Sequence, residues 1–133
     1  MSAFDLVATL KSARLQLIVN ALDGGALPGE LWLYTGSRPG VPGGSTTEAI
    51  QCVITLARPS GTVTANVLNF VGNLEGLRVA SATIAWGRFV DGAGAVRADF
   101  DVSVAAGSGA LRLNVVTGVS GSVVRLVSGT LTE

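Results

Sequence analysis

The sequence contains no histidine, and this absence limits the chemistry that the chain can perform. Histidine is the most common general base and metal ligand, and it activates the nucleophile in Ser-His and Cys-His dyads. A single cysteine, Cys52, leaves no zinc site and no intramolecular disulfide. We therefore expect a protein that is not an enzyme and that uses no metal or cofactor.

Charged residues are also scarce, at 14% of the chain against about 25% in an average domain. The nine basic and nine acidic residues cancel, and the closest basic pair is Lys11 and Arg14. Because binding to a nucleic-acid backbone needs a basic stripe, we expect no nucleic-acid partner. A neutral chain with 48% apolar residues favours a permanent assembly over a packed monomer with a Ser/Thr-rich surface.

Long apolar runs are missing as well. The longest uncharged run, residues 59–74, is rich in Gly, Asn, Ser and Thr, which is not typical of a membrane span. Asp5 precedes the first apolar stretch, and Lys11 and Arg14 interrupt it, so no secretory signal is expected. We expect no membrane partner and a soluble chain that stays in the cytoplasm where it is made.

The first segment predicts a helix, because residues 5–22 lack Gly and Pro and Gly24-Gly25 follows. A polar stripe on it consists of Ser12, Gln16, Asn20 and Asp23. The apolar arc is wider than one sheet contact needs and consists of Leu6, Val7, Leu10, Ala13, Leu17, Ile18, Ala21 and Leu22. Either the helix is wedged between two surfaces, or one side faces a partner subunit.

After Pro28 the apolar pattern alternates as in β-strands. An irregular loop rich in Gly and Pro is expected at 36–45. The predicted strands are 30–35, 49–57, 79–90, 95–105, 111–115 and 123–131. Six or seven strands predict an all-β fold, a Greek-key or jelly-roll-like sandwich with one N-terminal α-helix. Residues 1–26 form the helix or arm and 27–133 the sandwich, within a single domain.

The turn at 91–94 predicts a hairpin, and a second turn is expected at 106–108. Pairing Val102 with Leu111 in an antiparallel hairpin places Asp101 opposite Arg112. Asp99 and Asp101 then share an outward row with Arg97. We interpret this row as a solvated charge ladder, in preference to a glycosidase carboxylate pair or a calcium site.

The aromatic residues are few, and their faces differ. Trp86 shares a face with Ile84 and Phe100, which favours core packing. In the same way, Cys52 lies in an inward row of the strand at 49–57, which favours a buried, unreactive thiol.

Trp32 and Tyr34 occupy the opposite strand face from Leu31 and Leu33, so one of these pairs is expected to meet a neighbouring protein. Arg88 shares the face of Trp86, where it is stacked on the ring, paired with a carboxylate, or at the edge of a contact. The candidate interface residues are Trp32, Tyr34, Arg38 and Arg88.

Four segments carry a resemblance to a known family. They are Leu22-Asp23-Gly24 at the helix end, 31–36 followed by Pro39 and Pro42, 83–94, and 127–132. Together they are similar to the small head decoration, or cement, proteins encoded beside the major capsid protein in tailed phages and prophages. The similarity covers nearly the whole chain and is weakest at 61–76. It implies a jelly-roll-like sandwich that oligomerises and clamps adjacent capsid subunits, without catalytic residues.

We therefore expect a virion structural protein on the capsid surface. Its partners would be the major capsid protein and itself, as a homodimer or homotrimer. Two alternatives stay open: a phage tail or neck accessory protein, and a carbohydrate-binding adhesin that stacks sugars on Trp32 and Tyr34.

Overall fold

The computed structural model describes residues 6–72, 74–104, 106–107, 109–128 and 130–132. One helix and ten strands lie in this part of the chain, which is more strands than the sequence predicted. The elements are α1 (Ala8–Asp23), β1 (Glu30–Tyr34), β2 (Ile50–Thr55), β3 (Gly61–Thr64), β4 (Val67–Phe70), β5 (Glu75–Leu77), β6 (Trp86–Val90), β7 (Val96–Val104), β8 (Leu111–Leu113), β9 (Val123–Ser128) and β10 (Thr130–Thr132). A β-rich fold with one N-terminal helix is thus confirmed.

The larger sheet has seven strands in the order β2-β1-β6-β7-β8-β9-β5. Its two edge strands approach each other, because Cys52 of β2 forms an antiparallel bridge with Arg78 at the end of β5. Gly76 permits this approach, since a Cβ there would lie 2.5 Å from the carbonyl oxygen of Val53. The sheet therefore curls into a near-barrel.

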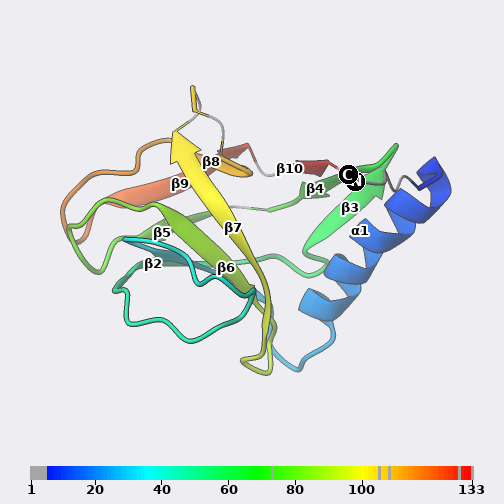
Figure 1. Cartoon of the computed structure of the whole chain (residues 1–133), viewed down its shortest axis with the longest axis horizontal. Coiled ribbons are helices and arrows are strands. Elements are labelled where there is room, and N and C mark those ends of the chain that lie inside the picture. Colours follow the sequence, from blue (N-terminus) through cyan, green and yellow to red (C-terminus); the bar gives the residue numbers. More distant parts are fainter. Residues whose placement is uncertain (1–5, 73, 105, 108, 129, 133) are drawn as a thin grey trace.

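The smaller sheet has the order β10-β4-β3 and lies between α1 and the near-barrel, as Figure 1 shows. Phe70 of β4 stacks on Phe89 of β6 with ring centroids 5.1 Å apart, which joins the two sheets. Leu15, Val19 and Leu22 of α1 belong to the same apolar cluster as these strands. Helix and sheets therefore share one core.

The helix covers most of the predicted range. It packs through Leu15, Val19 and Leu22, which are buried, against β3 and β4. Leu15 and Val19 were not in the predicted apolar arc, and two members of that arc, Leu10 and Leu17, are exposed. Of the two arrangements expected, α1 therefore packs on one side and leaves the other side uncovered. In the described part of the chain, no helix has the length and apolar character needed to cross a membrane.

The first two predicted strands and the loop between them are confirmed with small changes at their ends. The hairpin at 91–94 is also confirmed, because β6 and β7 pair antiparallel across it. Of the predicted inward row, Cys52 and Ile54 of β2 and the following Leu56 are buried, whereas Ile50 is only half-buried and the intervening Gln51 is buried as well.

The predicted strand at 79–90 is wrong in its first half, because β6 begins only at Trp86. The cause is Arg78, which is buried and uses its guanidinium to bind the carbonyl oxygens of Ala80, Ala82 and Val116. The carbonyls of Ala80 and Ala82 accept hydrogen bonds from Arg78 and so do not bind a neighbouring strand. Residues 79–85 therefore follow an irregular path.

The predicted antiparallel pairing after β7 is also wrong. Val102 does pair with Leu111, but β7 and β8 run parallel, so Arg112 lies opposite Ser103 and not Asp101. The amide of Gly109 donates to Ser103 Oγ at 2.9 Å, which places the returning chain beside β7 before β8 begins. The predicted strand at 123–131 is divided between β9 in the larger sheet and β10 in the smaller.

Candidate functional site

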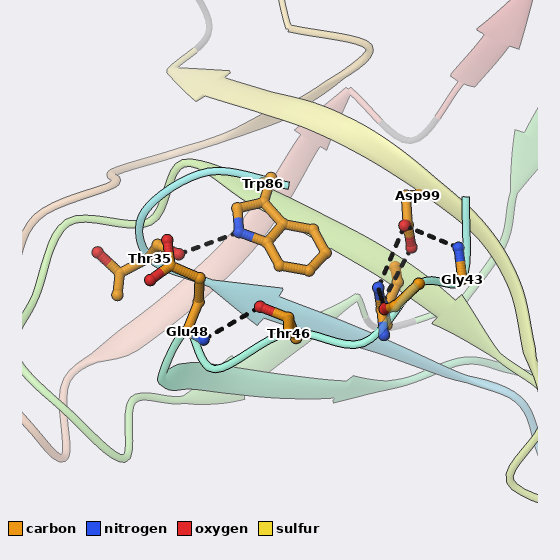
Figure 2. A network of polar contacts seen from close by, with 8 residues as sticks. Thr35, Gly43, Thr46, Glu48, Trp86 and Asp99 are labelled. Carbon is orange, nitrogen blue, oxygen red and sulfur yellow. Dashed lines mark hydrogen bonds and ion pairs between the residues drawn. The ribbon is translucent and has the colours of Figure 1, made fainter. Parts of the chain in front are cut away.

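The outer face of β1, β6 and β7 carries the residues that the sequence singled out. Inward side chains such as Leu33 and Phe100 fill the near-barrel, so the alternate positions point outward. These outward positions hold Tyr34, Trp86, Arg88 and Asp99, which we call the covered cluster. The irregular loop at 35–49 lies over this cluster (Figure 2).

Two aromatic rings form the base of the covered cluster. The rings of Tyr34 and Trp86 are stacked, with centroids 4.4 Å apart and planes 10° from parallel. The Arg88 guanidinium carbon lies 5.0 Å from the Trp86 ring centroid and 5.6 Å from that of Tyr34. The negative face of an aromatic ring attracts a cation at this distance, so Arg88 adds a third group to the stack of Tyr34 and Trp86.

Arg88 also forms an ion pair with Asp99, which lies directly opposite it in the β6–β7 ladder. Arg88 Nε is 3.0 Å from Asp99 Oδ1, and Arg88 Nη2 is 3.1 Å from Oδ2. Only 7% of the arginine side chain and 2% of the aspartate side chain are exposed. In this bidentate pair the positive and the negative charge neutralise each other at a position that is almost completely shielded from solvent.

The covering loop is attached to the cluster by hydrogen bonds that Figure 2 shows in part. Trp86 Nε1 donates to the carbonyl of Thr35 at 3.0 Å, and the amide of Gly43 donates to Asp99 Oδ2 at 3.0 Å. Arg88 Nη2 donates to the carbonyl of Gly44 at 3.1 Å. Within the loop, the amide of Glu48 donates to Thr46 Oγ1 at 3.0 Å. A loop rich in Gly and Pro is thereby held in one position.

The solvated charge ladder that the sequence predicted is not present in that form. Asp99 is buried under the loop and pairs with Arg88. Asp101 remains exposed and pairs with Arg38 at 3.2 Å, while Arg97 pairs with Asp91 at 2.7 Å. The loop at 35–49 makes the difference, because it places Arg38 and Gly43 over a strand face that the alternating pattern assigned to solvent.

The four candidate interface residues have different surroundings. Tyr34 and Arg88 are both buried and are in contact with each other within the covered cluster. Trp32 is half-buried two residues before Tyr34 on β1, and its Nε1 donates to Glu30 Oε1 at 3.2 Å. Arg38 is exposed on the covering loop. The structure thus brings Tyr34 and Arg88 together, and it leaves Trp32 and Arg38 with accessible surface.

Three titratable groups have pKa values that the structure shifts. Burial raises the pKa of the Cys52 thiol and of the Tyr34 hydroxyl above their usual values. Hydrogen bonds, first from the backbone amide of Ala95 and then from Arg97 and the amide of Ala93, lower the pKa of Asp91. Within the described residues, no group of three His, Cys, Asp or Glu side chains is placed to hold a metal ion.

Two exposed apolar surfaces lie outside the four candidate residues, although the first of them is on the N-terminal helix, for which the sequence also predicted a contact with a partner. One is the uncovered side of α1, which carries Val7, Leu10 and Leu17. The other is on β5 and β9, where Leu77 and Val123 are exposed. The wide apolar arc of the helix did signal the first surface. The sequence did not indicate the surface on β5 and β9, because its exposure depends on how the strands are arranged in the near-barrel.

Comparisons with known proteins add no family to these observations. A scan of protein-family models, a search of curated proteins and a search of solved structures each found no match to this chain.

Proposed function

We propose that this chain is a capsid decoration protein that binds the outer surface of a tailed-phage head and stabilises contacts between major capsid protein subunits. The proposal starts from the sequence resemblance at 22–24, 31–36, 83–94 and 127–132. It includes homo-oligomerisation and a place on the virion after synthesis in the host cytoplasm. The jelly-roll-like sandwich that the resemblance implies is part of the same proposal.

The observation that carries the proposal is the uncovered side of α1. Val7 is 65%, Leu10 52% and Leu17 65% exposed, although the opposite side of the helix is buried in the core. Exposed apolar side chains on one side of a helix cost solubility in a protein with so little charge, and such side chains mark contact surfaces. A helix with one packed side and one apolar outer side is suited to dock into a groove of a larger assembly.

The four segments of the resemblance have structural roles here. Residues 31–36 supply β1 and Tyr34, and residues 83–94 supply β6, Trp86, Arg88 and the hairpin turn. Together with Asp99 of β7 they build the covered cluster and fix the loop at 35–49. We infer that this rigid loop presents Arg38, with Trp32 nearby on β1, as a second contact region for the shell.

Stabilisation would act by mass action. A protein that binds the assembled shell but not free subunits adds its binding free energy to the stability of the shell. A specific contact buries about 800 Å² on each partner, and a copy that bridges two subunits gains from their fixed spacing. Many copies would then oppose the internal pressure of packaged DNA.

The test compares two forms of the same capsid protein. Purified chain is incubated with expanded heads and, separately, with unassembled major capsid protein of the phage or prophage whose genes adjoin this one. We expect binding to heads to be tighter by orders of magnitude, because only the lattice holds two half-sites at the required spacing. Equal binding to both forms, or to neither, would contradict the proposal.

Two substitutions on β1 provide matched variants. Trp32→Ala should weaken attachment to heads by about 1–4 kcal/mol if Trp32 is an interface anchor. Tyr34→Ala should instead lower the melting temperature of the free protein, because it removes a buried, stacked ring. A glycan array with both variants tests the adhesin alternative, which requires sugar binding that depends on Trp32.

A further inference from the structure

The outer surface of β5 and β9 combines apolar side chains with one pair of opposite charges. Leu77 is 60% and Val123 45% exposed. Beside them, Arg125 Nη2 lies 3.3 Å from Glu75 Oε2 on the same surface. We call Glu75, Leu77, Val123 and Arg125 the β5–β9 face. In Figure 1 these strands lie at the other end of the molecule from α1.

Further exposed apolar residues extend this face. Val79 and Val119 are exposed where the chain continues beyond Leu77 and before Val123. Their segments are joined by backbone bonds, from the amide of Arg78 to the carbonyl of Ser122 at 2.8 Å and from the amide of Gly121 to the carbonyl of Arg78 at 2.7 Å. The two segments that carry Val79 and Val119 are thus held side by side next to the β5–β9 face.

The face is complementary to itself. In the β5–β9 ladder Glu75 lies opposite Arg125, and Leu77 lies opposite Val123. Consider a twofold axis that is parallel to the strands and lies midway between β5 and β9. Rotation about this axis moves Glu75 to the position of Arg125 and Leu77 to the position of Val123, and the reverse. When two copies meet across it, each Glu75 faces the partner's Arg125 and each Leu77 faces the partner's Val123. Symmetric dimers use one surface patch on both subunits in this way.

We propose that the β5–β9 face is the interface through which a second copy of this chain binds, as a twofold symmetric dimer. The proposal rests on the homo-oligomerisation included in the proposed function and specifies its surface. The uncovered side of α1 is less suited to a second copy. An antiparallel pair of α1 helices centred between Leu10 and Leu17 would bring Arg14 of each copy together, and like charges in contact oppose binding.

The test uses two charge reversals, Glu75→Arg and Arg125→Glu, in analytical ultracentrifugation of the free protein. Each variant alone places like charges across the proposed axis, so we expect its dimer dissociation constant to rise at least about tenfold. In an equimolar mixture, Arg at position 75 of one variant faces Glu at position 125 of the other. We expect the mixture to form dimers again, although the pair within each chain stays mismatched.

The control is Leu17→Lys on α1, which should leave the dimer unchanged while weakening attachment to heads. If a charge reversal prevents folding, Leu77→Lys at an exposed position replaces it and should give monomers. The proposal would be overturned if the wild-type protein were strictly monomeric or trimeric, or if either single variant formed dimers. It would also be overturned if the mixture stayed monomeric, or if Leu17→Lys lost its dimers. Because no capsid is present, these outcomes are independent of whether the protein binds heads.

Discussion

At the scale of single residues, the Arg88–Asp99 pair determines whether the covered cluster forms. Both side chains are almost completely removed from water, so neither charge is stable without the other. The pair also holds Gly43 and Gly44, and with them the position of the loop that carries Arg38. A change at Arg88 should therefore alter the outer surface of the protein as well as its stability.

We predict that Arg88→Met lowers the free energy of unfolding by about 3–5 kcal/mol, because it leaves a buried carboxylate without its cation. Asp99→Asn leaves the arginine unpaired and should also be costly. The double variant should cost less than the sum of the two, with a coupling free energy of about 2 kcal/mol. Urea denaturation of the four proteins measures this cycle, and additive losses would show that the two residues do not act as a pair.

Asp91 makes a separate, pH-dependent contribution at the β6–β7 turn. Its carboxylate accepts hydrogen bonds from the amides of Ala93 and Ala95 and pairs with Arg97. These contacts lower its pKa in the folded state. A lowered folded pKa means that the contribution is complete above the unfolded pKa, about 3.9, and is lost as the pH falls through the folded pKa.

We predict that Asp91→Asn lowers the melting temperature by a constant amount between about pH 5 and 8. The difference between wild type and variant should become smaller below about pH 4, as the wild-type carboxylate takes up its proton. Thermal unfolding followed by circular dichroism across this range measures the difference. A gap that is independent of pH down to strong acid would show that the charge of Asp91 is not involved.

At the scale of elements, the sequence predicted those strands whose pattern is local. The Asp91–Gly94 turn identified the β6–β7 hairpin, but a one-residue shift in the ladder between Phe89 and Val90, which the sequence did not reveal, is what places Arg88 opposite Asp99. The alternation in 30–35 and 49–57 was sufficient for β1 and β2. Each of these elements needs only its own residues and one neighbour to be recognised.

The elements that were missed depend on contacts between distant segments. The irregular path of 79–85 follows from the bond between Arg78 and Val116, which no local pattern reveals. The parallel direction of β8 depends on the chain returning beside Ser103. For the same reason, the burial of Asp99 could not be read from its strand, because the group that covers it lies in the loop at 35–49.

The uncovered side of α1 gives the prediction that belongs to this scale. Leu17→Lys should reduce binding to expanded heads, because it replaces an exposed apolar side chain on the uncovered side of α1 with a second charge beside Arg14. The melting temperature of the free protein should change little, since Leu17 is outside the core. Gln16→Lys, on the exposed polar side of α1, adds the same charge and should leave head binding unchanged. Equal binding by wild type and Leu17→Lys would exclude α1 from the contact.

At the scale of the whole molecule, two exposed apolar surfaces lie at different ends of one rigid core. The core joins α1, the smaller sheet and the near-barrel in a single apolar cluster. We infer that α1 binds the shell while the β5–β9 face binds a second copy. A dimer built in this way carries two shell-binding helices and can bridge neighbouring capsid subunits, which increases attachment through effective concentration.

The most direct measurement of this account is the heat stability of decorated and stripped heads. Heads are stripped of the protein, and the release of packaged DNA is followed during heating, before and after purified protein is added back. We predict that stripped heads release DNA at a lower temperature than decorated heads. Adding the wild-type chain should restore the original temperature, and adding Leu17→Lys should not. Identical release temperatures for stripped and decorated heads would contradict the proposed function.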